Sequence, residues 1–166
     1  AGGNGTGSID ASDVTDAGGI SSSGLAGPNV WRVRGAIPAT GSPGIGWNSA
    51  APIGTQGAQF DVSTLGYSNI IVSFDYYVTS KGEAKTCVLY TTDGWATTNV
   101  ANTLAYGANS AFILTNTSSP NTVAGTYFYE TAGQGFYNNI VADFTGIPGV
   151  QTNPLFGFRI VNAAKG

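Results

Sequence analysis

Residues able to do acid–base, nucleophilic or metal chemistry are scarce in this chain. It has no His, a single Cys, and charged side chains amount to 9% of its 166 residues, where roughly 25% is typical. Glu83 and Glu130 are the only glutamates, and no spacing places a carboxylate pair across a cleft as a glycosidase requires. Nucleophile-elbow, phosphate-loop, dinucleotide and zinc motifs are all missing from the sequence. We therefore predict a non-catalytic protein.

Three carboxylates near the start of the chain could bind a metal. Asp10, Asp13 and Asp16 recur every third residue, and carboxylate oxygens suit calcium, a hard cation. The spacing is not that of an EF-hand, so the favoured alternative is a solvated, turn-forming acidic arm. Three other aspartates fall on expected strands, where we expect outward polar positions: Asp61, Asp75 and Asp143.

Aromatic residues in expected loops could bind a glycan. Trp47, Trp95 and Tyr106 fall in loops or at loop edges, and an exposed ring can stack on the apolar face of a sugar. The alternative is that these rings cap the ends of the fold or pack under long loops.

The elements that would position these residues are strands. Residues 1–28 form a Gly- and Ser-rich arm, and residues 29–166 form the domain. Ile70, Val72, Phe74, Tyr76 and Val78 alternate with mostly polar residues, a pattern typical of a half-buried antiparallel strand. Further strands are expected near residues 86–92, 111–115, 126–130, 139–144 and 155–161. No segment has a helical period.

Many short strands separated by turn signals predict an all-β, antiparallel two-sheet β-sandwich of the jelly-roll kind. Alternation assigns the core to Trp31, Phe60, Val72, Phe74, Tyr76, Phe144, Phe156, Phe158 and Ile160.

The bulk properties exclude some partners. The net charge is -3 and there are six basic residues, too few to form a nucleic-acid footprint. No apolar run approaches the roughly 20 residues of a membrane span. Cys87 has no Cys to pair with and is expected to be a small core residue. The start at Ala1 fits the mature end of an exported chain, so we expect an extracellular protein, in which Asn4 and Asn116 begin N-glycosylation triplets.

Several segments carry a resemblance to a known family. They are GLAGPNVWRVRG from Gly24, GWNSAAPIGTQGAQFDVSTLGYSNIIVSFDYYVTSKGEA from Gly46, YTTDGW from Tyr90, and IPGVQTNPLFGFRIVNAA from Ile147. Together they resemble an extracellular β-sandwich domain of bacteria, found in secreted and surface-anchored proteins and beside carbohydrate-active enzymes. Domains of that family continue into a closing strand with an aromatic residue and an Asp-Asn pair, which this chain lacks after Ala164.

A sandwich without its closing strand would expose an unpaired edge, which invites a strand from another chain. The arm could be that donor through Ile9, Ala11, Val14 and Ile20, or it could fold back on its own domain. We therefore expect a structural subunit of a surface filament or matrix, a homopolymer assembled by β-strand complementation. The alternative is a carbohydrate-binding module of a secreted protein, with an extracellular polysaccharide as its partner.

Overall fold

The computed structural model describes residues 6–10, 52–55, 57–78, 84–107, 110–117, 120–131 and 135–164. These residues form ten strands and one short 3-10 turn, η1, at Ser110–Phe112. The strands are β1 (Thr6–Asp10), β2 (Gly57–Asp61), β3 (Ile71–Val78), β4 (Lys85–Thr91), β5 (Asn99–Val100), β6 (Leu104–Tyr106), β7 (Ile113–Asn116), β8 (Gly125–Tyr129), β9 (Gly135–Asp143) and β10 (Gly157–Asn162).

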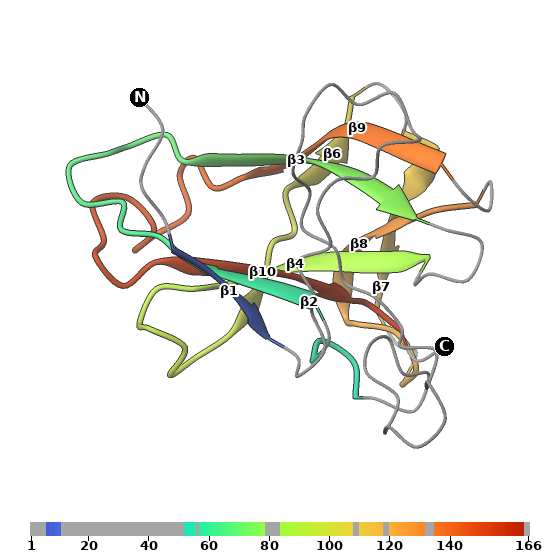
Figure 1. The fold of residues 1–166 in the computed structure, drawn as a ribbon, viewed down its shortest axis with the longest axis horizontal. Helices are drawn as coiled ribbons and strands as arrows, with labels where there is room; N and C mark the ends of the chain where they lie inside the picture. Colours follow the sequence, from blue (N-terminus) through green and yellow to red (C-terminus); the bar gives the residue numbers. More distant parts are fainter. Residues whose placement is uncertain are drawn as a thin grey trace, which may run out of the picture.

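The strands form two layers (Figure 1). Sheet A has the order β1-β2-β10-β4-β8-β7, with β5 also paired to β4, and sheet B has the order β3-β9-β6. Every pairing between named strands is antiparallel. The predicted all-β, antiparallel two-sheet sandwich is confirmed.

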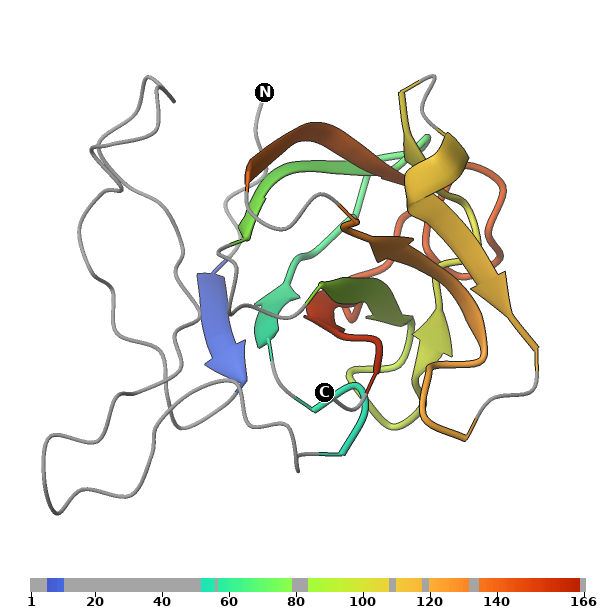
Figure 2. The same cartoon turned by 90° about the vertical axis from the view of Figure 1, so that its right-hand side faces the viewer.

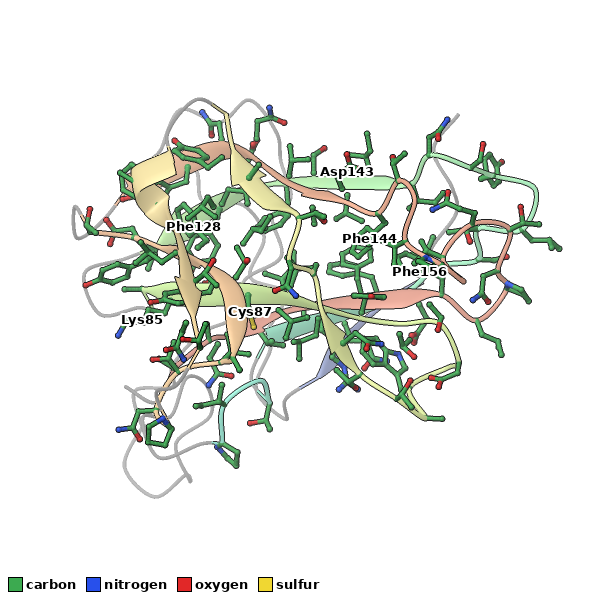
Figure 3. All side chains as sticks on the ribbon, turned by 180° about the vertical axis from the view of Figure 1, so that it is seen from behind. Lys85, Cys87, Phe128, Asp143, Phe144 and Phe156 are labelled. Atoms are coloured by element: carbon green, nitrogen blue, oxygen red, sulfur yellow. The ribbon has the colours of Figure 1, made fainter. Side chains whose placement is uncertain are left out.

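Aromatic side chains fill the space between the sheets. Phe128, Phe144 and Phe156 are at most 2% exposed and lie between the two layers in Figure 3. Phe128 meets its neighbours edge-on or stacked, with ring centroids 5.0 to 6.0 Å apart, a range that aromatic pairs prefer. The core assignments of Phe144 and Phe156 are confirmed. Six others are half-buried and pack on the core or on one another: Phe60, Val72, Phe74, Tyr76, Phe158 and Ile160. Trp31 lies outside the described residues.

A second, smaller apolar cluster lies on the outer face of sheet A. It consists of Cys87, Leu89, Val161 and Ala163, with Val100, Val123 and Tyr127 packed against it. Strand β4 is thus buried on both faces, because Val88 belongs to the main core. Cys87 is fully buried, as predicted, and this burial raises the pKa of its thiol to about 12.

Strand β9 begins at Gly135, before the expected start at Asn139. The sequence pattern misses its first residues because a β-bulge interrupts the alternation of the strand. The pairing between β3 and β9 shifts register between Phe74 and Tyr76. Asn139 has a φ of 60°, and its backbone N–H donates to Asp75 Oδ1 at 2.8 Å. The extra residue moves the side chains before and after Asn139 out of a single period-two pattern.

Candidate functional site

The edge of sheet A brings the N-terminal arm onto the domain. Strand β1 pairs with β2 in a continuous register, from Thr6 opposite Asp61 to Asp10 opposite Gly57. On its other side β2 pairs with β10. Figure 2 shows β1 in blue as the outermost strand, beside β2. Residues 11–56 connect the two strands, so this edge is completed by a segment remote in the sequence.

A cluster of polar and aromatic side chains fixes the outer face of β2. We name it the Trp95 cluster; its members are Gln59, Asp61, Trp95 and Arg159. Arg159 Nε donates to Gln59 Oε1 at 2.6 Å, and Gln59 Nε2 donates to Asp61 Oδ2 at 3.0 Å. Trp95 Nε1 donates to Asp61 Oδ1 at 2.6 Å. The Arg159 guanidinium lies 3.9 Å from the centroid of the Trp95 ring, a cation–π geometry.

The loop that carries Trp95 is held in an unusual backbone conformation. Gly94 and Trp95 have φ values of 68° and 72°, a region that a bulky residue rarely occupies. The Thr91 hydroxyl accepts the Trp95 backbone N–H at 2.9 Å. Asp93 accepts hydrogen bonds from the Thr97 hydroxyl and N–H and from the Thr91 hydroxyl, and these lower its pKa to about 2. The hydrogen bonds offset a local strain of about 1–3 kcal/mol.

Two glycines allow the close packing at this edge. A Cβ at Gly157 would lie 3.1 Å from Trp95 Cζ2 and 2.8 Å from Asp61 Oδ1. A Cβ at Gly57 would lie 1.9 Å from the Ile160 carbonyl oxygen, well inside any contact that a carbon atom tolerates. Glycine at both positions lets β2 lie against β10 and lets the indole lie over the sheet.

The predicted glycan-binding residues do not form one group. Trp95 lies on the outer face of sheet A, where its indole N–H and one ring face contact Asp61 and Arg159. Tyr106 lies on β6 of sheet B and packs edge-on against Phe112 in the core. Tyr106 is the last residue of β6 and is half-buried, an arrangement that matches the alternative in which the ring packs at the end of the fold; glycan binding by these rings stays a prediction. Trp47 lies outside the described residues.

Most of the predicted arm and metal residues also fall outside the described residues. Ile9 and Asp10 lie on β1, opposite Ala58 and Gly57. The others are Ala11, Val14, Ile20, Asp13 and Asp16. In the described part of the chain, no three His, Cys, Asp or Glu side chains gather into a group that could hold a metal ion. Calcium binding stays a prediction.

From the sequence we did not identify four residues that shape this site: Gln59, Arg159, Gly57 and Gly157. Arg159 alternates with apolar residues as any outward strand residue does, and nothing in the sequence pairs it with Trp95. The usable signal was Gly57 next to an alternating strand, since a glycine there often marks a close backbone approach.

The chain matches no protein-family model, no curated protein sequence and no solved structure. Among the described residues, no helix has the length and apolar character needed to cross a lipid bilayer.

Proposed function

We propose that this protein is an extracellular structural subunit that assembles with copies of itself by exchanging strand β1. The observation that supports the proposal is the pairing of β1 with β2 at the edge of sheet A, in register over the whole length of both strands. Backbone hydrogen bonds supply most of such an interaction. The same bonds can therefore form whether β1 comes from the same chain or from a neighbour.

The acceptor strand β2 is held by contacts that do not involve β1. Its inner edge pairs with β10, and Gln59 and Asp61 are fixed by the Trp95 cluster. A preorganised acceptor lowers the ordering cost of binding. Unpaired, β2 would present a row of free backbone groups, the kind of edge that promotes pairing between chains.

The length of residues 11–56 permits either arrangement. Closing a long connection costs entropy that grows only slowly with its length. Pairing of β1 with its own chain therefore competes with pairing between chains, and the balance depends on the effective concentration of β1 near its own β2. Exchange in which each chain donates to the next is head to tail and propagates as a filament. The low fraction of charged residues keeps repulsion between subunits weak.

The direct test places the donor and the acceptor on different chains. Ser8 pairs with Gln59, so we would mix a Ser8→Cys chain with a Gln59→Cys chain under mild oxidation. Cys87 is buried and does not compete. Strand exchange predicts a disulfide between chains, seen as a dimer on a non-reducing gel. The matched control replaces Gln59→Cys by Ser73→Cys, an exposed position on sheet B, and should give no such dimer.

A second test uses the two faces of β1. Antiparallel partners share a face of the sheet, so position 9 lies on the face of Ala58, which is 7% exposed, and position 8 on the face of the half-buried Gln59. Ile9→Lys should abolish assembly and Ser8→Lys should preserve it, measured by light scattering and electron microscopy. If the intact chain is monomeric at every concentration and deletion of residues 1–25 leaves a stable domain, strand exchange is wrong. Screening that domain on a glycan array would then test the alternative, a carbohydrate-binding module.

A further inference from the structure

One buried side-chain oxygen on β4 has no hydrogen-bond partner within the described part of the chain. This atom is Oγ1 of Thr86, a residue that is 2% exposed. Every other buried side-chain oxygen or nitrogen among the described residues has a hydrogen-bond partner. An unsatisfied buried hydroxyl costs about 1–3 kcal/mol. A native core seldom keeps such a group without a use for it.

The cross-strand neighbour of Thr86 is an amide. Asn162 on β10 is the register partner of Thr86 and is also 2% exposed. The Ala163 N–H donates to the Lys85 carbonyl, so the adjacent Thr86–Asn162 pair is of the non-hydrogen-bonded kind, in which side chains lie closest. Asn162 Nδ2 donates to the carbonyls of Pro52 and Ala164 at 3.3 and 3.2 Å, which fixes the amide in place.

A buried carboxylate lies on the same face, one strand further along the sheet. Phe128 on β8 pairs with Thr86, and Glu130, two residues beyond Phe128, is 3% exposed. Residues two apart on a strand share a face, and such diagonal neighbours are within reach of a long side chain. The Tyr137 hydroxyl donates to Glu130 Oε1 and orients the carboxylate.

We propose that Thr86 and Asn162 form a covalent ester bond between β4 and β10. Thr86 Oγ1 attacks Asn162 Cγ, and Glu130 takes the hydroxyl proton. The tetrahedral centre collapses as the bond from Cγ to Nδ2 breaks, and the proton passes from Glu130 to the leaving nitrogen. The products are the ester and one molecule of ammonia, so no oxidant, reductant or cofactor is needed.

The fold supplies what this reaction lacks in solution. A hydroxyl and an amide held together on neighbouring strands react as one molecule, which is worth effective molarities of about 10⁵–10⁸ M in well-oriented systems. Burial keeps water from hydrolysing the product, and release of ammonia to the solvent draws the exchange forward. The bond joins two central strands of sheet A and does not depend on how β1 pairs.

The test is the intact mass of the purified full-length chain under denaturing conditions. We expect the mass to be lower than that of the sequence by one ammonia, and a protease digest to contain one peptide that joins the segments around Thr86 and Asn162. Hydroxylamine should separate the two segments without cutting the backbone. The Thr86→Val and Asn162→Asp variants should lose the ammonia deficit. Thr126→Val, a buried threonine on β8, is the matched control and should keep it. Glu130→Gln should raise the uncross-linked fraction.

An intact mass equal to that of the sequence overturns the proposal. So does a deficit that persists in Thr86→Val and that hydroxylamine resolves by cutting the backbone after an asparagine, because that result identifies a succinimide instead. The digest of the wild-type chain decides the question even if a variant does not fold, since it either contains the joined peptide or does not.

Discussion

Replacing Gly57 with alanine should lower the free energy of unfolding by more than the addition of one methyl group suggests. The new Cβ would lie 1.9 Å from the Ile160 carbonyl oxygen and 2.7 Å from Val161 Cα. Both are backbone atoms, so no side chain can rotate away and the two strands must separate. Gly57 also has a φ of +156°, which disfavours any residue with a Cβ.

The magnitude follows from what must break. Separation at Gly57 threatens the two backbone hydrogen bonds of the adjacent Ala58–Ile160 pair, worth about 1 kcal/mol each. The disfavoured φ adds about 1–3 kcal/mol. Together these give a loss of about 3–5 kcal/mol in the free energy of unfolding. For a domain of this size each kcal/mol lowers Tm by about 2–4 °C, so Tm should fall by roughly 6–20 °C.

The assay is denaturant and thermal unfolding of Gly57→Ala beside Gly135→Ala. Gly135 has no heavy atom within 4 Å of its would-be Cβ and no positive φ, so its substitution should change the free energy of unfolding by less than about 1 kcal/mol. If the two variants unfold within about 1 kcal/mol of each other, β2 does not approach β10 closely enough at Gly57 to exclude a side chain. Glycine at position 57 would then not be required to form the acceptor edge.

Two further predictions concern the Asp93 loop and the core. The pKa of Asp93 is lowered to about 2 in the folded chain, against about 3.9 unfolded, so its stabilising effect is present above about pH 4 and is lost as the pH falls through about 2. The difference in unfolding free energy between wild type and Asp93→Asn should therefore shrink from pH 6 to pH 2, and a constant difference would contradict this cause. Phe128→Ala should cost about 3–5 kcal/mol because Phe128 is 1% exposed, whereas Leu114→Ala on β7, where Leu114 is 36% exposed, should cost under about 1 kcal/mol in the same denaturant titration.

The sequence predicts an individual strand well where one face of that strand is exposed to solvent. Residues 70–78 alternate regularly, and β3 spans Ile71–Val78 with Ser73 and Asp75 exposed. The pattern fails where the geometry departs from a flat half-buried strand. The bulge at Asn139 breaks the alternation, so the first half of β9 was not predicted. Strand β4 is buried on both faces, so the residues of β4 show no alternation that distinguishes an inner face from an outer one.

The candidate site was harder to predict than the fold because its contacts are remote in sequence. Trp95 was singled out as a loop aromatic, but its bond to Asp61 and its contact with Arg159 depend on which strands pair. The pairing of β1 with β2 has the same character. A short strand of Thr, Gly, Ser, Ile and Asp has little pattern of its own, and its partner depends on which edge of sheet A is open to it.

Because Cys87 is buried, its reaction with a thiol reagent can be used to measure how often sheet A opens. The chain contains no other thiol, and this one is fully buried on β4, opposite Val161 of β10. A thiol reagent can reach it only during a transient opening of the centre of sheet A, so the labelling rate measures the free energy of that opening. The labelling rate can be measured both for the dilute chain and for a dense assembly, in which light scattering interferes with optical methods. Slower labelling after assembly would show how much assembly stabilises the centre of sheet A in each subunit, without an introduced probe.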